Sequence, residues 1–398
     1  MTAYLNALGV ICALGRGKEE VARNLFAGDC SGIREQAGWV PQRALPVGAV
    51  QGELTAIADD MPHHRSRNNQ LLLEAALQIR PDIDKAIQTF GRERIGVVLG
   101  TSTSGIDEAS QGLAHYLREQ RFPVEYDYQQ QELGAPANFL AEWLQLSGPA
   151  YVISTACTSS ARALMSAQRL LDLGLCDAVL CGGVDTLCKL TLNGFSALEA
   201  VSEQRCNPFS ANRNGINIGE AAVLFLMTRQ AAGDHSIALL GSGASSDAHH
   251  ISAPEPNGRG AQQAMGKALS RAGLQAQEIA YLNLHGTATQ HNDAMESVAV
   301  AAVFPAGVPC SSSKPMTGHT LGAAGALEAA FCWLSLSAEN REHALPPHIW
   351  DGQADPELPA LQWVTKATRL TSIAPRYLMS NSFAFGGNNV SLIIGDAP

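Results

Sequence analysis

Six apolar runs with the length of β-strands alternate along this chain with segments of helical periodicity. The strand-like runs lie at 94–100, 151–155, 177–183, 221–227, 279–284 and 378–383. The helical segments lie at 159–173, 259–271, 294–303 and 321–338. Because such alternation produces sheets covered by helices, the pattern predicts an α/β architecture. The apolar stretch 4–15 lacks a basic leader and a clear cleavage site, so we expect a first strand and turn rather than a signal peptide.

The two halves of the chain share a faint repeat. Segments 97–103 and 282–289 both run a hydrophobic strand into Gly-Thr-small-Thr. Each is followed later by a serine-rich turn and an alanine-rich helix. Four matched residues can also arise by chance. If the repeat is real, it predicts two similar halves, residues 1–235 and 236–398, with an active site between them where strands end.

The composition disfavours several classes of protein. The formal charge of −10 argues against bulk nucleic-acid binding. No run of about 20 apolar residues occurs, so we expect no membrane-spanning segment. Only 16% of the residues are charged, which favours a surface partly covered by another subunit. The nine cysteines show neither a disulfide pattern nor the usual zinc spacing, so we expect reduced thiols in a cytoplasmic protein and no metal.

Cys157 stands where the predicted strand 151–155 turns into a predicted helix. Unpaired backbone N–H groups in the first turn of a helix favour a thiolate. The same groups could hold the oxyanion that forms when a thioester is attacked. The turn mimics a nucleophile elbow but lacks the G-x-S-x-G motif. A nucleophile and a structural cysteine buried in a tight turn are both compatible with this stretch.

Two histidines and a lysine follow in the second half. His285 ends a predicted strand, while Lys314 and His319 surround a turn that precedes a helix of glycine and alanine. A lone histidine is more often a hydrogen-bonded core residue than a catalyst, but small neighbours leave room for a substrate beside His285 and His319. Neutral imidazoles that donate to a developing enolate would suit acyl carbanion chemistry. Glu328, the charge in that apolar helix, is expected to pair with Lys314.

Six motifs together resemble those of the β-ketoacyl–acyl carrier protein synthases, the ketosynthases of fatty acid and polyketide assembly. They occur in the order and approximate spacing of that family: TACTSS, RNGINIGEAA, SSDAHHISAPEPNG, HGTAT, KPMTGHTLGAAGALE and NSFAFGGNN. The resemblance covers nearly the whole chain. It implies the thiolase fold, in which two related halves form a layered αβαβα arrangement and the enzyme works as a dimer.

The resemblance implies a role for each matching residue. Cys157 would accept the acyl chain as a thioester. His285 and His319 would steady the malonyl thioester carbonyl as carbon dioxide leaves. The carbanion would then attack the acyl thioester and extend the chain by two carbons. Lys314 and Glu328 would form an ion pair that organises the histidines.

Other positions are expected to bind the substrate. The backbone N–H groups of Cys157 and Phe385 would form an oxyanion hole, and Phe385 would gate the pocket. Thr287 and Thr289 would line the path of phosphopantetheine, which arrives on the carrier protein, so no resident cofactor is expected. Three apolar residues are predicted to form the pocket wall, with plain core packing as the open alternative: Ile106, Phe195 and Ile216.

The segment 63–69 carries two arginines where the family often has basic docking residues. Arg65 and Arg67 are therefore expected to meet an acidic acyl carrier protein, and an ordinary solvated loop is the alternative. Glu199 lies near a position where many relatives carry arginine, which weakens the docking hypothesis.

Several departures from the family pattern point to a specialised member. The segment 379–395 is predicted to be a hairpin whose glycine turn brings backbone close to a ligand. That turn carries Ala384 where the family has glycine, and Asn388 where threonine is usual. The segment 125–139 also differs from housekeeping enzymes. These departures predict a ketosynthase that acts on a polyene-type or other secondary-metabolite chain.

Three alternatives are weaker. A thiolase needs a second catalytic cysteine near the C-terminus, but the last one here is Cys332, inside a predicted helix. A chain-length-factor-like subunit, which shapes the pocket of a partner, typically lacks the nucleophile or the histidines. A priming synthase pairs cysteine with histidine and asparagine, whereas His319 favours the elongating type. A homodimer and a heterodimer with a related subunit both stay open.

Overall fold

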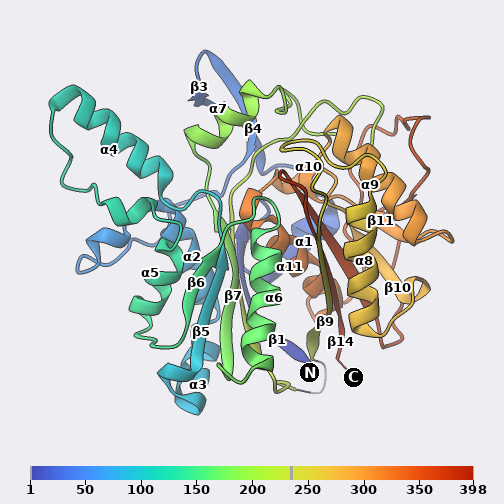
Figure 1. The fold of residues 1–398 in the computed structure, drawn as a ribbon, viewed down its shortest axis with the longest axis horizontal. Helices are drawn as coiled ribbons and strands as arrows, with labels where there is room; N and C mark the ends of the chain where they lie inside the picture. The colour runs from blue at the N-terminus through green and yellow to red at the C-terminus, as the bar shows by residue number, and fades with distance from the viewer. Residues whose placement is uncertain (1, 234–235, 398) are drawn as a thin grey trace.

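The strands form one large mixed sheet and one small hairpin. The structure is a computed structural model that describes residues 2–233 and 236–397 (Figure 1). The strands in these ranges are β1 (Ala3–Cys12), β2 (Gly15–Arg16), β3 (Ile33–Val40), β4 (Arg43–Gly48), β5 (Ile95–Gly100), β6 (Ala150–Ile153), β7 (Ala178–Asp185), β8 (Ala221–Thr228), β9 (Ile237–Ser246), β10 (Ile279–Asn283), β11 (Pro309–Ser311), β12 (Gln362–Trp363), β13 (Tyr377–Ala384) and β14 (Asn388–Asp396). The six predicted strands and the predicted C-terminal hairpin are confirmed, and the ends of the strands shift by one or two residues.

The helices lie before, between and after these strands. They are α1 (Lys18–Ala27), α2 (Arg67–Gln78), α3 (Arg80–Phe90), α4 (Ile106–Glu119), α5 (Ala135–Trp143), α6 (Ser159–Asp172), α7 (Lys189–Ala197), α8 (Arg259–Ala272), α9 (Gln290–Val303), α10 (Lys314–Thr317) and α11 (Ala324–Leu336). The four predicted helices correspond to α6, α8, α9 and α11. The start of the last one is instead a short 3-10 turn, η5 (Leu321–Ala323).

The two halves of the chain repeat one strand topology. The first half has the order β6-β5-β7-β8-β1 and the second has β11-β10-β13-β14-β9. In both, the first three strands run parallel and the other pairs are antiparallel. Strands β1 and β9 pair where Ala3 faces Leu239, which joins the halves into one sheet. The internal repeat is therefore confirmed. The boundary predicted at residue 235 lies outside the described residues.

Two helices in equivalent positions of the repeat form the central layer. Helices α6 and α11 share one core with side chains from β1, β7, β8, β13 and β14. They approach closely because Gly325 of α11 has no side chain: a Cβ atom there would lie 2.7 Å from that of Ala161 on α6. Helices α2 and α5 cover the other face of the first-half strands, and α8 and α9 cover that of the second half (Figure 1). This is the predicted αβαβα layering.

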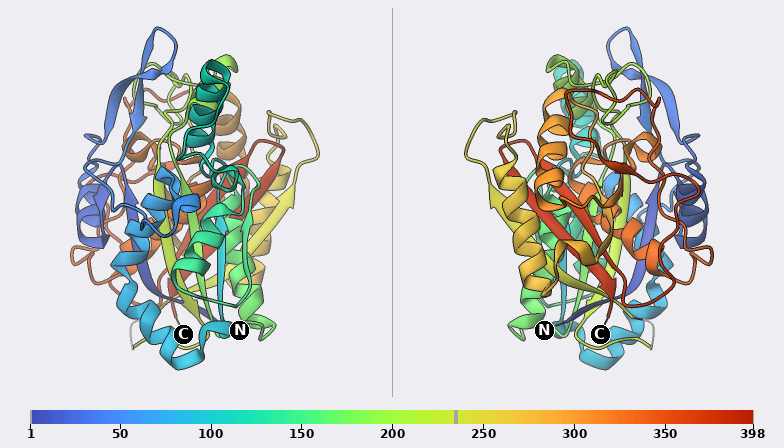
Figure 2. Two further views of the ribbon diagram at one scale, coloured as in Figure 1. Left: turned by 90° about the vertical axis from the view of Figure 1, so that its left-hand side faces the viewer. Right: turned by 90° about the vertical axis from the view of Figure 1, so that its right-hand side faces the viewer.

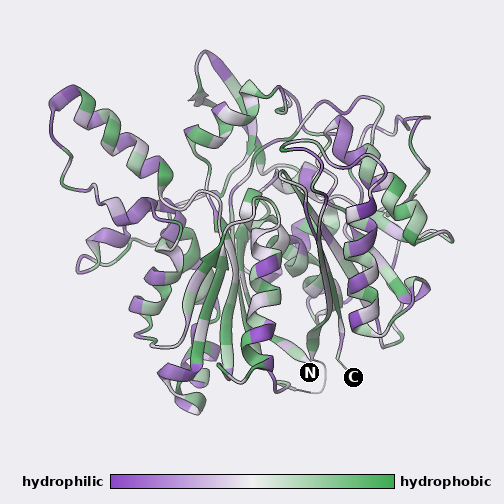
Figure 3. Cartoon of the chain, viewed as in Figure 1, coloured by the Kyte–Doolittle hydropathy of each residue, from purple (hydrophilic) through white to green (hydrophobic). Residues whose placement is uncertain are grey.

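The strands are coloured mainly as hydrophobic in Figure 3, whereas hydrophilic and hydrophobic residues alternate along the outer helices. The hairpin β3–β4 projects from the end of the molecule opposite to the two termini, and α4 extends sideways from the body (Figures 1 and 2). In the described ranges, no helix combines the length and apolar character that a membrane crossing requires.

Candidate active site

Cys157 lies in a tight turn between β6 and α6, as the sequence predicts. The turn is closed by the backbone N–H of Ser159, which donates to the carbonyl of Ala156 at 3.0 Å. Ala156 has a φ angle of 53°, a left-handed conformation that costs a non-glycine residue roughly 1–2 kcal/mol. Strain of this kind persists where the surrounding structure fixes it, and it is frequent at functional sites. Here it aims the sulfur of Cys157 at the space between the two halves.

The thiol of Cys157 is protonated at neutral pH. Burial raises its pKa to about 12, although the charge of Lys314 and the backbone N–H of Cys157 itself oppose the shift. The backbone N–H favours the thiolate in the expected direction, but desolvation outweighs it, so the resting sulfur is a thiol. A base must take the proton when the sulfur attacks.

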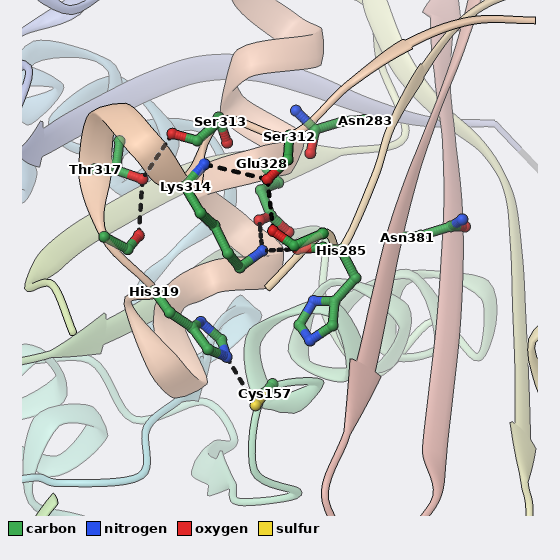
Figure 4. A network of polar contacts seen from close by, with 12 residues as sticks. Cys157, Asn283, His285, Ser312, Ser313, Lys314, Thr317, His319, Glu328 and Asn381 are labelled. Carbon is green, nitrogen blue, oxygen red and sulfur yellow. Dashed lines mark hydrogen bonds and ion pairs between the residues drawn. The ribbon is translucent and has the colours of Figure 1, made fainter. Parts of the chain in front are cut away.

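His319 is in place to be that base. Its Nε2 atom lies 3.0 Å from Sγ of Cys157 (Figure 4). The ring of His285 lies edge-on to that of His319, with 5.3 Å between the ring centroids. Burial, followed by the charge of Lys314, holds the pKa of both histidines well below 6.5. Both imidazoles are therefore neutral at physiological pH, and each carries one N–H group that can donate to a substrate oxygen.

A buried ion pair contacts the backbone of His285. Nζ of Lys314 lies 2.5 Å from Oε1 of Glu328, and it also donates to the backbone carbonyl of His285 (Figure 4). This confirms the predicted pairing of Lys314 with Glu328. Burial raises the pKa of Glu328 to about 7, against the pull of Lys314. The lysine thus links helix α11 to the strand end that carries His285.

Two buried carboxylates that sequence reasoning missed hold the histidine turns. Glu296 of α9 accepts the backbone N–H groups of His285 at 2.8 Å and Gly286 at 2.7 Å. Asp185 at the end of β7 accepts the backbone N–H of Gly322, three residues after His319, at 2.5 Å. The sequence does carry a signal for both. Asp185 ends an apolar strand and Glu296 lies inside a predicted helix, and a buried acid needs a hydrogen-bonding partner.

A cavity of 530 Å³ opens above the sulfur and the two rings. Eight of the predicted site residues line it: Cys157, His285, His319, Thr287, Thr289, Phe195, Ile216 and Phe385. The hydroxyls of Thr287 and Thr289 are 2.9 Å apart, and the rings of Phe195 and Phe385 are 5.7 Å apart. The lining also contains residues that the sequence did not single out as part of a site, among them Leu198, Asp247, His250 and His291.

Three predicted positions lie elsewhere. Ile106 begins helix α4 and is not part of the cavity lining, so its place in the pocket wall is not seen in this chain alone. The guanidinium group of Arg67 binds buried Glu220, with Nε at 2.9 Å from Oε2. Arg65 pairs with exposed Asp59. Both arginines are therefore engaged within the chain, and their docking role stays a prediction.

The geometry supports acyl transfer. A sulfur nucleophile, a neutral imidazole in contact with it and a second imidazole beside the first, all lining one cavity, can form and break thioesters and stabilise an enolate. The ligand atoms of Cys157, His285 and His319 also lie within 4.8 Å of one another, so a soft divalent cation could compete with substrate here.

Comparison with known proteins agrees with this site. The model "Beta-ketoacyl synthase, N-terminal domain" matches residues 6–232, and "Beta-ketoacyl synthase, C-terminal domain" matches residues 237–349. A solved complex described as a ketosynthase (ApeO) with its chain length factor (ApeC), from Xenorhabdus doucetiae, is 48% identical with a TM-score of 0.93, and the match covers 100% of this chain and 98% of that chain. A β-ketoacyl synthase from Burkholderia phymatum STM815 is 27% identical with a TM-score of 0.87 over all of both chains.

A further similarity covers only part of each protein. The 3-oxoacyl-[acyl-carrier-protein] synthase 2 of Rhizobium meliloti (strain 1021) is 36% identical over 270 residues. The aligned part is 63% of this chain and 61% of that protein. In that alignment the chain therefore spans less than two thirds of the relative.

Proposed function

Because the chain belongs to the β-ketoacyl synthase family, we propose that it condenses malonyl–acyl carrier protein with an acyl chain held on Cys157, with loss of carbon dioxide. The family places the chain among the β-ketoacyl–acyl carrier protein synthases, which are acyltransferases of fatty acid and polyketide synthesis. The observation that carries the proposal is the 3.0 Å contact between Nε2 of His319 and the thiol of Cys157 at the floor of the cavity.

The first step is transfer of the acyl chain. The sulfur of Cys157 attacks the thioester carbonyl of the acyl carrier protein, and the phosphopantetheine thiol leaves with the proton that the cysteine gives up. His319 is close enough to relay this proton. We assign the oxyanion to the backbone N–H groups of Cys157 and Phe385, and the first of these already lies beside the sulfur and lowers its pKa.

The second step forms the new carbon–carbon bond. Malonyl–acyl carrier protein enters past Thr287 and Thr289, and the N–H groups of His285 and His319 stabilise the enolate that forms as carbon dioxide leaves. The carbanion attacks the acyl thioester, and the thiolate of Cys157 leaves and takes up one proton from water. The product is longer by two carbons. Lys314 holds the strand end that carries His285, because its Nζ atom donates to the backbone carbonyl of that histidine.

We further assign a partner subunit to the edge of the sheet. Strand β6 ends the sheet order, and its residues are only half-buried, so its outer edge is free for another strand. Helix α4 and the loop after it expose apolar side chains, including Leu117, Val124 and Tyr128. The complex of the Xenorhabdus ketosynthase with a chain length factor supports a heterodimer, with this chain as the catalytic half because it holds Cys157.

The cavity wall and the cysteines support a substrate class and a cellular location for the protein. The cavity wall of Phe195, Leu198 and Ile216 suits an unbranched apolar chain, and the departures in the Ala384 turn and at Asn388 support a specialised secondary-metabolite or polyene-type chain. All nine cysteines are free, which supports a cytoplasmic location. We propose no bound cofactor, since the carrier protein supplies the phosphopantetheine.

The test is a condensation assay with purified acyl and malonyl carrier proteins, run with this chain alone and with a candidate partner subunit. We expect a product longer by two carbons, and a loss of about 10²–10³-fold in kcat for His285→Ala, as for removal of one oxyanion donor. His343→Ala, in the loop after α11 and outside the cavity lining, is the control and should keep the rate. Condensation at the full rate by His285→Ala would overturn the proposed role of His285. If no product forms with this chain alone or with the partner subunit, the proposed condensing activity is wrong.

A further inference from the structure

Two histidines and a glutamate meet beside helix α2, outside the cavity of the active site. His63 and His64 belong to the short 3-10 turn η1 (Pro62–His64), and Glu142 lies near the end of α5. Oε2 of Glu142 is 3.3 Å from Nε2 of His63 and 3.0 Å from Nε2 of His64. One carboxylate oxygen therefore faces the same ring nitrogen of two adjacent histidines.

These distances are close to those of a metal site. Zinc binds imidazole nitrogen and carboxylate oxygen at about 2.0–2.2 Å, so two ligand atoms on a tetrahedral ion lie about 3.3 Å apart. The two contacts to Glu142 have this length already. The three ligand atoms all lie within 4.8 Å of one another. The two histidine nitrogens belong to that set, and the side chain of His63 is 27% exposed.

One ligand is fixed in place and the other two can be reached from solvent. The side chain of His64 is 5% exposed, its ring packs edge-on to Phe139, and its carbonyl accepts a hydrogen bond from Nδ2 of Asn69 at 2.9 Å. The side chain of Glu142 is 53% exposed. An ion could therefore enter from the surface and keep a water molecule in its fourth position, as zinc does with three protein ligands.

The local charge also favours a cation. The carboxylate of Asp127 lies close enough to act on His64. The guanidinium group of Arg65, next in the chain, is directed to Asp59. The segment that we expected to offer arginines to a carrier protein thus presents its histidines to a glutamate that lies 79 and 78 residues further along the chain.

We propose that His63, His64 and Glu142 form a binding site for a divalent transition-metal ion of the zinc type. Two imidazoles and a carboxylate suit Zn²⁺ better than Mg²⁺ or Ca²⁺, which take oxygen ligands. The ion ties η1 to α5, and α5 closes the segment that contains α4 and the exposed apolar loop. Its effect is to fix the base of the α4 segment, and it takes no part in the condensation.

The test measures zinc in a Cys157→Ala background, which removes the sulfur ligand from the other cluster that could hold a metal. After equilibration with Zn²⁺ and desalting, mass spectrometry of the metal should give one ion per chain. Titration calorimetry should show binding at least about tenfold weaker for added Glu142→Gln or His63→Gln, since even outer partners of a metal are worth 10–100-fold. Glu132→Gln, an exposed glutamate just before α5, is the matched control and should bind like the parent.

A thermal unfolding scan of each variant completes the test. Without metal, Glu142→Gln and Glu132→Gln should have the Tm of the parent. Zn²⁺ should raise the Tm of the parent and of Glu132→Gln only, because binding to the folded state alone stabilises it. No zinc uptake by the Cys157→Ala chain would overturn the proposal. Uptake that survives both Glu142→Gln and His63→Gln would equally overturn it. Neither result affects the condensation assay, which reports on the other cluster.

Discussion

Asp185 provides the sharpest prediction about how the fold holds the active site. Its Oδ1 atom accepts four hydrogen bonds at 2.7–2.8 Å, from the backbone N–H groups of Ser102 and Thr103 and the hydroxyls of Thr101 and Thr103. Its Oδ2 atom accepts the backbone N–H of Gly322. The carboxylate therefore joins the loop after β5 to the turn that follows His319.

The substitution Asp185→Asn tests this arrangement. The amide oxygen can keep the four bonds of Oδ1, but the amide nitrogen then faces the N–H of Gly322, so two donors meet. The lost bond to a charged acceptor and the unpaired buried N–H are each worth roughly 1–3 kcal/mol. Burial raises the pKa of Asp185, so a neutral side chain recovers part of this cost. We expect a net loss of about 2–4 kcal/mol in the free energy of unfolding.

The kinetic consequence is separate from the loss of stability. A displaced Gly322 moves the turn that places His319 3.0 Å from Cys157. Misplacement by about 1 Å can cost 100-fold in rate, so the acylation rate should fall by at least about tenfold under conditions where the variant is folded.

Urea unfolding and acylation kinetics measure the two effects. Asp60→Asn, an exposed residue, is the control and should change stability by less than about 0.5 kcal/mol. An Asp185→Asn protein as stable as the wild type would refute the account of the five hydrogen bonds. A destabilised variant that keeps its full acylation rate would refute only the link to His319.

Four further predictions concern protonation and packing. Because burial keeps the pKa of His285 and His319 well below 6.5, malonyl decarboxylation should show no histidine step near 6.5 in a pH–rate profile. A step near 6.5 that persists when Glu328 and Glu296 are replaced by glutamine would contradict the neutral buried pair. Since the same histidines titrate near 6.5 when unfolded, their contribution to the free energy of unfolding should decrease as the pH falls below that value. The difference between the wild type and His319→Ala in urea unfolding from pH 7.5 to 5.5 measures it, because the buried acids with raised pKa values are common to both proteins. With a pKa of about 12, Cys157 should be alkylated by iodoacetamide about tenfold faster per pH unit from pH 7 to 10, and a plateau in that range, followed by intact mass, would show a lower pKa. Gly325→Ala should destabilise the protein by about 1–3 kcal/mol in urea unfolding because its Cβ atom would lie 2.7 Å from that of Ala161, whereas Gly266→Ala, with open space around it on α8, should be neutral or stabilising.

The parts of the fold that the sequence predicts are those with strong periodicity. The apolar strands β5, β7 and β8 are buried along their whole length, so they stand out as continuous runs. Helix α2 does not stand out, because Asn68, Asn69 and Glu74 are buried in it and obscure its apolar face. Helix α4 is equally hard to predict, because it exposes leucine and tyrosine toward a surface that this chain alone does not cover.

The site divides in a similar way. The sequence predicts four site residues because they lie among small residues at the ends of predicted elements, within recognisable motifs: Cys157, His285, Lys314 and His319. The pairing of Arg67 with Glu220 joins residues 153 positions apart and leaves no local signal, so a docking loop was the natural expectation. The raised pKa of Cys157 also depends on burial between the two halves, which the segment around it does not reveal.

Intact-protein mass after incubation with a panel of acyl–acyl carrier proteins tests the central claim most directly. The wild type should gain one acyl group from some chains and not from others, and Cys157→Ala should gain none. An adduct that persists on Cys157→Ala, or the absence of any adduct on the wild type both alone and with a partner subunit, would contradict Cys157 as the nucleophile of this enzyme.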